Sequence, residues 1–137
     1  EDKNDPQYEM CQKNMEVLQS FKDDEGRPLT ISTMVFPSRL VYSSEDESQT
    51  VDEVETSVPR PANKRLVASY INFYVTNKAI IMPAFKLPSD EVAKQTLQQL
   101  FPDREIIPIY SREILLGGGN IHCITQQIPQ GKTNDER

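Results

Sequence analysis

The chain has 137 residues, 36% of them hydrophobic, which suits the modest core of one domain or of part of a larger one. Its formal net charge is −6 and it contains no basic cluster, which argues against nucleic acid or an anionic membrane as a partner. No apolar stretch approaches the roughly 20 residues that a membrane-spanning helix needs.

The first ten residues, EDKNDPQYEM, are acidic, do not begin with Met and lack the hydrophobic region of a signal peptide. We therefore expect the chain to start inside a longer reading frame. Its two cysteines, Cys11 and Cys123, are too few for a disulfide framework in a chain of this size. Both are interpreted as reduced thiols, which predicts a cytoplasmic location.

A helix is predicted over 6–22, because Asp5 can cap its first amides and Pro6 suits the first helical position. One face repeats apolar residues at helical spacing: Tyr8, Cys11, Met15, Leu18 and Phe21. Packing is therefore the expected role of Cys11. The next segment, 29–36 (LTISTMVF), is rich in β-formers and is predicted to be a strand.

Residues 43–61 are polar and carry six carboxylates and one Arg, which predicts a long acidic surface loop. A loop of this length is either a solvated connector or a functional segment, such as an active-site lid. The sequence leaves both interpretations open.

The strongest β signal lies in 68–84, where SYINFYVT and AIIMPA flank an Asn-Lys pair and predict a hairpin. Pro83 is expected at a strand end. A helix should follow, with Ser89 as its candidate cap and Pro102 as its stop. The segment EIIPIY (105–110) is a third predicted strand.

The remaining segments are a short helical turn at 111–116, a tight glycine loop at 117–120, a last strand at 120–128 and a flexible tail at 129–137. From 68 to 128 the predicted order is therefore strand, strand, helix, strand, loop, strand. Alternation of this kind indicates the α/β fold class.

The run GGGNIHC (117–123) is the constellation that points to chemistry. Consecutive glycines usually mark backbone that needs unusual torsions or a close approach. On a strand, alternation would place His122 and Cys123 on opposite faces, so His122 is a poor candidate for the base that serves this thiol. Taken alone, Cys123 is either a buried structural cysteine or a nucleophile.

Other chemistries find little support in the sequence. One His and two distant cysteines cannot form a zinc site, so no metal and no cofactor are expected. The glycine run is not followed by the Lys and Ser or Thr of a phosphate-binding loop, and nothing places a serine beside His122.

The motif GGGNIHCITQQ (117–127) resembles the closing active-site motif of the agmatine deiminases. The blocks ASYINFY, IIMPAF and FPDREIIPI resemble neighbouring blocks of that family, in the same order, and DPQYEMCQKN resembles the segment after its His-x-Asp region. The resemblance is weakest over 40–62. It identifies residues 1–128 as the C-terminal part of a deiminase catalytic domain.

This resemblance implies a partial α/β propeller of the pentein type, built from ββαβ blades. It also implies hydrolysis of agmatine to N-carbamoylputrescine and ammonia, a step towards putrescine, through a covalent thiouronium intermediate. Cys123 would be the nucleophile, and the backbone of Gly118 and Gly119 would bind substrate at the pocket floor. The expected partner is thus agmatine, a small cationic guanidino compound, and a homo-oligomer is left open.

The family's proton-transfer His and guanidinium-binding carboxylates match nothing in this chain and should lie upstream of it. We therefore expect the chain alone to be inactive, and a partial propeller would also leave open sheet edges. Two alternatives are a bacterial-type peptidyl-arginine deiminase and a truncated interaction module without catalysis. The ITQQ ending favours agmatine deiminase, and the intact GGGNIHC run argues against the module.

Overall fold

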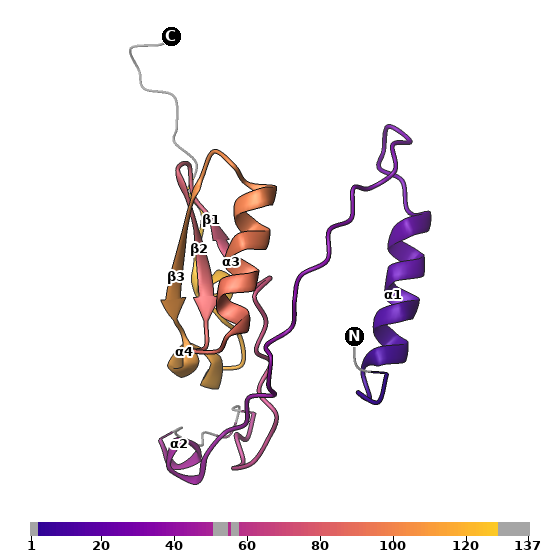
Figure 1. The fold of residues 1–137 in the computed structure, drawn as a ribbon. Helices are drawn as coiled ribbons and strands as arrows, with labels where there is room; N and C mark the ends of the chain where they lie inside the picture. Colours follow the sequence, from indigo (N-terminus) through magenta and orange to yellow (C-terminus); the bar gives the residue numbers. More distant parts are fainter. Residues whose placement is uncertain (1–2, 51–54, 56–57, 129–137) are drawn as a thin grey trace. The chain divides into compact units, whose positions relative to one another are not determined.

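The computed structural model describes residues 3–50, 55 and 58–128. They form two compact units, one that ends at Thr33 and one that begins at Met34. The first unit holds helix α1 (Tyr8–Ser20), and the second holds the other helices and the strands (Figure 1). No helix in the described ranges is long and apolar enough to cross a membrane.

Helix α1 is shorter than predicted at both ends. Asp5 does not cap it directly, because its carboxylate accepts the Gln7 amide, at 2.8 Å, just before the helix begins. The predicted packing of Cys11 is wrong: Cys11 is exposed, and α1 contains no buried residue. An apolar stripe is buried only when another element covers it, and the described part of this unit contains no second helix or paired sheet.

The strand predicted at 29–36 is also wrong, since these residues take no regular conformation. A β-forming sequence needs a neighbouring strand to satisfy its backbone amides and carbonyls, and none is described beside this segment. Just before this segment, an isolated bridge between Lys22 and Pro28 closes the turn that follows α1.

The second unit is built on a three-stranded sheet of β1 (Tyr74–Val75), β2 (Ala79–Ala84) and β3 (Glu105–Tyr110), in that order. The predicted hairpin is confirmed, because β1 pairs antiparallel with β2, although β1 has only two residues. Pro83 is the penultimate residue of β2. The third predicted strand is confirmed and pairs in parallel with β2. Parallel strands need a crossover connection, which α3 (Ser89–Leu100) supplies.

Helix α3 covers one face of the sheet (Figure 1). Alternation along paired strands turns Ile80, Met82 and Ile106 to the same face. Ala93 and Leu97 of α3 belong to the same buried cluster, and all five side chains are at most 4% exposed. This contact is the centre of the hydrophobic core.

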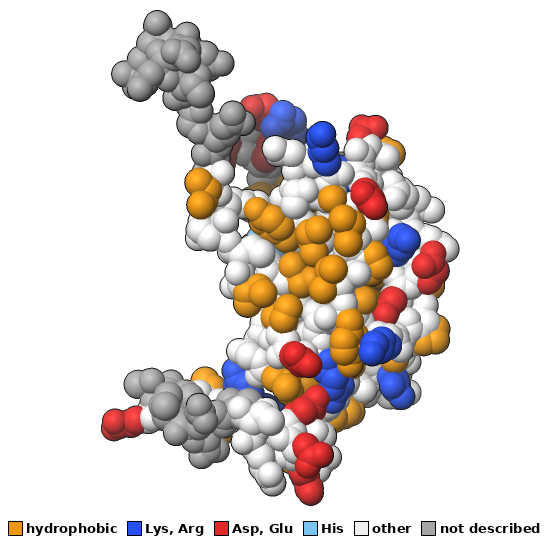
Figure 2. All heavy atoms as spheres, turned by 90° about the vertical axis from the view of Figure 1, so that its left-hand side faces the viewer, with side chains coloured by type: hydrophobic (Ala, Val, Ile, Leu, Met, Phe, Trp, Pro, Cys, Tyr) orange, Lys and Arg blue, Asp and Glu red, His pale blue; other side chains and the backbone are white. Residues whose placement is uncertain are grey.

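The other face of the sheet is apolar but only partly covered. Ile81 and Ile107 are paired and half-buried there, and Ile109, on the same face, is 42% exposed. Figure 2 views the molecule from the side on which β3 lies and shows hydrophobic side chains gathered together. Contiguous exposed apolar surface of this kind marks a place where another part of a protein packs.

The Asp90 carboxylate, rather than the predicted Ser89 cap, holds the loop between β2 and α3. Asp90 accepts the amides of Phe85 and Leu87, each at 3.1 Å, and the Tyr70 hydroxyl at 2.6 Å. Ser89 lies inside the helix and meets the buried Tyr70 hydroxyl at 2.7 Å. Burial, and then the hydrogen bond to Asp90, raises the pKa of Tyr70 far above its ordinary value, so its hydroxyl stays protonated.

The described part of the acidic segment 43–61 is not all loop. It contains a short helix, α2 (Glu45–Gln49), in which Ser44 and Glu47 form a capping box. Its residues 51–54 and 56–57 lie outside the described residues, as does the predicted tail at 129–137.

Replacement of Asp90 tests the loop network. Asp90→Ala should lower the free energy of unfolding by about 2–3 kcal/mol, because three donors lose their acceptor. The control Glu91→Ala removes a neighbouring charge from the same helix N-terminus and should cost about 0.5 kcal/mol. Urea denaturation followed by circular dichroism measures both. Equal losses would mean that Asp90 acts only through the helix dipole.

Candidate active site

Cys123 lies in a short 3₁₀ helix, His122–Ile124, and the strand predicted over 120–128 is wrong. Strand alternation therefore does not separate the two side chains. The structure nevertheless shows no hydrogen bond between the His122 ring and the Cys123 thiol within the described residues. Asn72 accepts the backbone amides of His122 and Cys123, and the amides of Ile124 and Thr125 bond to carbonyls within the turn.

Asn72, which the sequence did not single out, makes three contacts with the turn that carries the thiol. Its backbone carbonyl accepts the His122 amide at 3.2 Å. Its side-chain Oδ1 accepts the Cys123 amide at 3.4 Å, and its Nδ2 donates to Cys123 Sγ at 3.1 Å. The available signal was its position inside the block ASYINFY, which lies far from the glycine run in sequence.

These surroundings favour the thiolate form of Cys123. The hydrogen bond from the Asn72 side chain, and then the backbone amide of Asn120, lowers the pKa of Cys123, while desolvation opposes this more weakly. The thiol is exposed in the described chain. An accessible cysteine that ionises readily is the kind that reacts as a nucleophile.

The glycines next to Cys123 have different local roles. A Cβ on Gly119 would lie 2.7 Å from Cys123 Cβ and 2.9 Å from its Sγ, so a side chain there would displace the thiol. Gly118 has a φ of +96°, and a Cβ on it would lie 2.5 Å from Nη2 of Arg60. These contacts explain why glycine is present. The binding of substrate by Gly118 and Gly119 stays a prediction.

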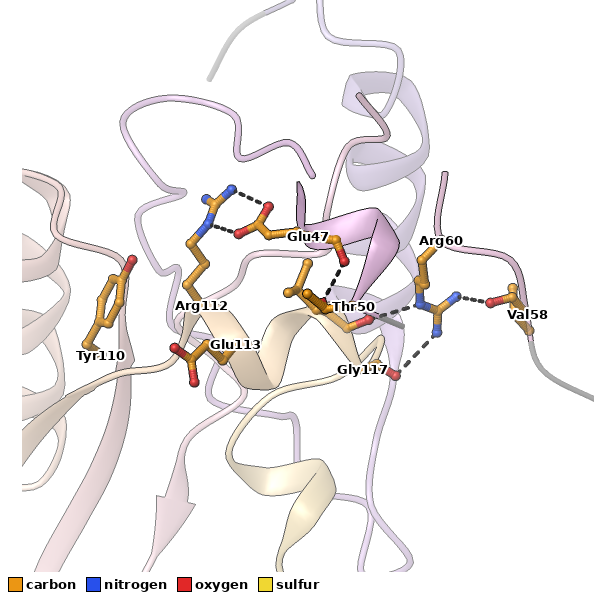
Figure 3. A pocket seen from close by; sticks show the side chains of 9 residues that line it. Glu47, Thr50, Val58, Arg60, Tyr110, Arg112, Glu113 and Gly117 are labelled. Carbon is orange, nitrogen blue, oxygen red and sulfur yellow. Dashed lines mark hydrogen bonds and ion pairs between the residues drawn. The ribbon is translucent and has the colours of Figure 1, made fainter. Parts of the chain in front are cut away.

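Arg60 binds the C-terminal end of α4 (Arg112–Leu116), the helix predicted as a short turn at 111–116. Its Nε donates to the Leu116 carbonyl at 3.0 Å and its Nη2 to the Gly117 carbonyl at 3.2 Å (Figure 3). The guanidinium thus satisfies carbonyls that the end of a helix leaves unpaired.

A cavity of about 860 Å³ lies beside this end of α4 (Figure 3). Its lining consists of Glu47, Thr50, Val58, Arg60, Tyr110, Arg112, Glu113, Leu116 and Gly117, and does not include Cys123. Arg112 binds the Glu47 carboxylate through Nε at 2.5 Å and Nη2 at 2.9 Å, which lowers the pKa of Glu47 to about 2. The Glu47 carboxylate is thus ionised, and its negative charge is already compensated by Arg112. Among the described residues, no three His, Cys, Asp or Glu side chains are grouped to hold a metal ion.

Known proteins match nearly the whole chain. The profile of the Porphyromonas-type peptidyl-arginine deiminase family matches residues 1–129. A Latilactobacillus sakei protein assigned as an agmatine deiminase is 48% identical over 132 residues, which are 96% of this chain and 36% of that protein. The agmatine deiminase of Enterococcus faecalis has a TM-score of 0.86 at 37% identity, over 95% of this chain and 35% of its own. A Porphyromonas gingivalis structure assigned as an arginine deiminase has a TM-score of 0.77 at 29% identity, over 96% and 33%.

The close approach at Gly119 can be tested directly. Gly119→Ala should destabilise the fold by about 1–3 kcal/mol and slow alkylation of Cys123 by iodoacetamide, because the added methyl group displaces the thiol. Gly117→Ala is the matched control, since its Cβ would meet only the Ile114 carbonyl, at 3.2 Å. Mass spectrometry of the Cys123 peptide gives both rates. An unchanged rate in Gly119→Ala would contradict the steric argument.

Proposed function

Because this chain belongs to the Porphyromonas-type peptidyl-arginine deiminase family, we propose that it is the C-terminal part of an agmatine deiminase whose nucleophile is Cys123. The observation that carries the proposal is the exposed thiol that Asn72 holds in a turn favouring the thiolate. Two relatives assigned as agmatine deiminases, at 48% and 51% identity, support this substrate.

In the proposed reaction, the Cys123 thiolate attacks the central carbon of the agmatine guanidinium and forms a C–S bond. The tetrahedral adduct loses ammonia after one nitrogen is protonated, which leaves a thiouronium intermediate. Water then adds to the same carbon and gives up two protons, one of which replaces the proton taken by the leaving nitrogen and the other of which converts ammonia to ammonium. Cleavage of the C–S bond releases N-carbamoylputrescine and restores the thiolate. A covalent intermediate divides one difficult hydrolysis into two easier steps, and the bound cation further favours the thiolate.

In this proposal, the residues that transfer protons and bind the guanidinium lie in the part of the protein upstream of this chain. The His122 ring makes no hydrogen bond to the thiol in the described residues, and Glu47 is already paired with Arg112. The chain spans only about a third of the length of the relatives that it matches. An upstream histidine and upstream carboxylates would complete the site.

The sheet would form part of a larger α/β propeller of the pentein type. The element order β1, β2, α3, β3 is the ββαβ order of one blade. The partly exposed second face of the sheet and the exposed apolar stripe of α1 would be covered by the rest of the protein. A cytoplasmic location and a homo-oligomeric state stay predictions from the sequence.

A peptidyl-arginine deiminase is the second candidate, because the matching family carries that name. The curated relatives assigned as agmatine deiminases are 48% and 51% identical, against 29% for a solved structure assigned as a peptidyl-arginine deiminase, which favours agmatine. Both candidates need the same nucleophile. The relative turnover of agmatine and of a blocked arginine peptide by the full-length protein distinguishes them.

The role of the thiol is tested by Cys123→Ser in the full-length protein. Ureido-product formation from agmatine should fall by on the order of 10³-fold or more, because a hydroxyl replaces the nucleophile. Cys11→Ser is the matched control and should keep the activity, since Cys11 lies in α1 and takes no part in the proposed reaction. A Cys123→Ser variant that turns over agmatine normally would exclude the proposed mechanism.

The incompleteness of the site is tested on the chain alone. It should form no ureido product from agmatine, because its described residues supply no acid or base to the thiol. Turnover that Cys123→Ser abolishes would instead show that the chain contains this machinery. A haloacetamidine, which mimics the substrate, should still label Cys123 faster than Cys11. Equal labelling of the two would favour a non-catalytic interaction module.

A further inference from the structure

We infer that Arg60 is a positioning residue for the nucleophile: its guanidinium fixes the start of the glycine run 117–119 and, through that run, the place of Cys123. The inference rests on the proposed deiminase function, but the geometry behind it is independent of the substrate. Arg60 belongs to the acidic segment 43–61, which the sequence left open as either a solvated connector or a functional segment. The role proposed for Arg60 makes this segment functional.

The Arg60 guanidinium directs all three of its nitrogens at backbone carbonyls. Its Nε donates to Leu116 at 3.0 Å, its Nη2 to Gly117 at 3.2 Å and its Nη1 to Val58 at 3.3 Å (Figure 3). Leu116 is the last residue of α4 and Gly117 is the first glycine of the run, so Arg60 bridges the point where the helix passes into the run. The planar fork of an arginine fixes such bonds relative to one another.

Direct contacts lead from Arg60 to the thiol along the glycine run. A Cβ on Gly118 would lie 2.5 Å from Nη2 of Arg60, so the guanidinium packs against the backbone of this glycine. The next residue, Gly119, lies against the nucleophile, since a Cβ on it would be 2.7 Å from Cys123 Cβ. Glycines adopt many backbone conformations, so the course of such a run depends on contacts from outside it. Arg60 supplies a contact of this kind.

The acidic segment holds Arg60 in place relative to α4. The backbone carbonyl of Arg60 accepts the Ser48 hydroxyl at 2.7 Å, and Ser48 belongs to α2. The neighbouring Glu47 accepts Nη2 of Arg112, at the other end of α4, at 2.9 Å. The segment therefore contacts α4 through a carboxylate at its first residue and through a cation at its last carbonyls, the arrangement that the helix dipole favours. A side chain anchored in this way can position backbone accurately.

The charge of Arg60 does not act on the sulfur directly. Hydrogen bonds lower the pKa of Cys123, first from the Asn72 side chain and then from the Asn120 backbone, with no charged side chain of the described residues among the causes. Asn120 directly follows the glycine run and is 1% exposed. A displaced run would move the Asn120 amide away from the sulfur and destabilise the thiolate. Loss of Arg60 would thus affect Cys123 only through the position of the run.

Replacement of Arg60 in the full-length protein tests this role. In Arg60→Ala, the midpoint of the pH dependence of Cys123 alkylation by iodoacetamide should rise towards that of an ordinary thiol, about pH 8.5. The kcat for agmatine should fall by about tenfold or more, because a small displacement of the nucleophile is costly. Arg60→Lys keeps the positive charge but lacks the planar fork, so it should recover only part of each effect. Parental values in Arg60→Lys would mean that a charge suffices and would overturn the role of the paired carbonyl bonds.

Arg104→Ala is the matched control. Arg104 is also half-buried and also donates its Nε to a backbone carbonyl, that of Thr76 at 3.2 Å, but it precedes β3, whereas α4 follows that strand. The control should lower the melting temperature and leave the alkylation midpoint and kcat unchanged. If Arg60→Ala changes them no more than Arg104→Ala does, the inference is wrong. If Arg60→Ala fails to fold by circular dichroism, the comparison of Arg60→Lys with Arg104→Lys decides in the same way.

The two proposals can fail separately. A raised midpoint in Arg60→Ala, in a protein that does not deiminate agmatine, would support the role of Arg60 at the glycine run and overturn the proposed function. An unchanged midpoint and kcat in an active deiminase would overturn the role of Arg60 alone.

Discussion

The parallel pairing of β2 with β3 is the contact on which the second unit depends. Their register runs without interruption from Ala79 opposite Glu105 to Ala84 opposite Tyr110. A tight turn cannot join parallel strands, so the chain must cross over, and the crossing helix α3 buries one face of the sheet. The end of β3 leads directly into α4 and then into the glycine turn. The register of this pair therefore sets where the turn that carries Cys123 begins.

Elements with a local signal were predictable from the sequence. The hairpin, α3, β3 and α4 all form where turn residues and apolar spacing placed them. The two strands that do not form, 29–36 and 120–128, were inferred from composition alone. A strand depends on a neighbour that its own residues do not identify. At 120–128 two backbone amides, those of His122 and Cys123, are bound by Asn72 instead of by a neighbouring strand.

The candidate site was predictable only in part, because a residue's sequence does not identify the residues that folding brings beside it. The glycine run pointed to Cys123, and Gly119 does lie against that thiol. The sequence could not reveal that Asn72 would bind the sulfur, because folding alone brings the two segments together. In the sequence, Arg60 was only the single cation of an acidic loop. In the structure, its side chain binds the end of α4 and occupies the space beside Gly118. Ser89 also does not cap α3 as expected: it lies inside the helix, and its neighbour Asp90 binds amides of the loop before it.

The long sequence separation between Asn72 and Cys123 links folding to proton binding. In an unfolded chain Cys123 is an ordinary thiol with a pKa near 8.5. Folding lowers the pKa of Cys123, so the folded state releases this proton more readily. The stability gained in this way is fully present above the unfolded pKa and is lost as the pH falls through the folded one. A newly made or denatured copy therefore carries a less ionised and less reactive sulfur, and Cys123 gains reactivity as the tertiary structure assembles.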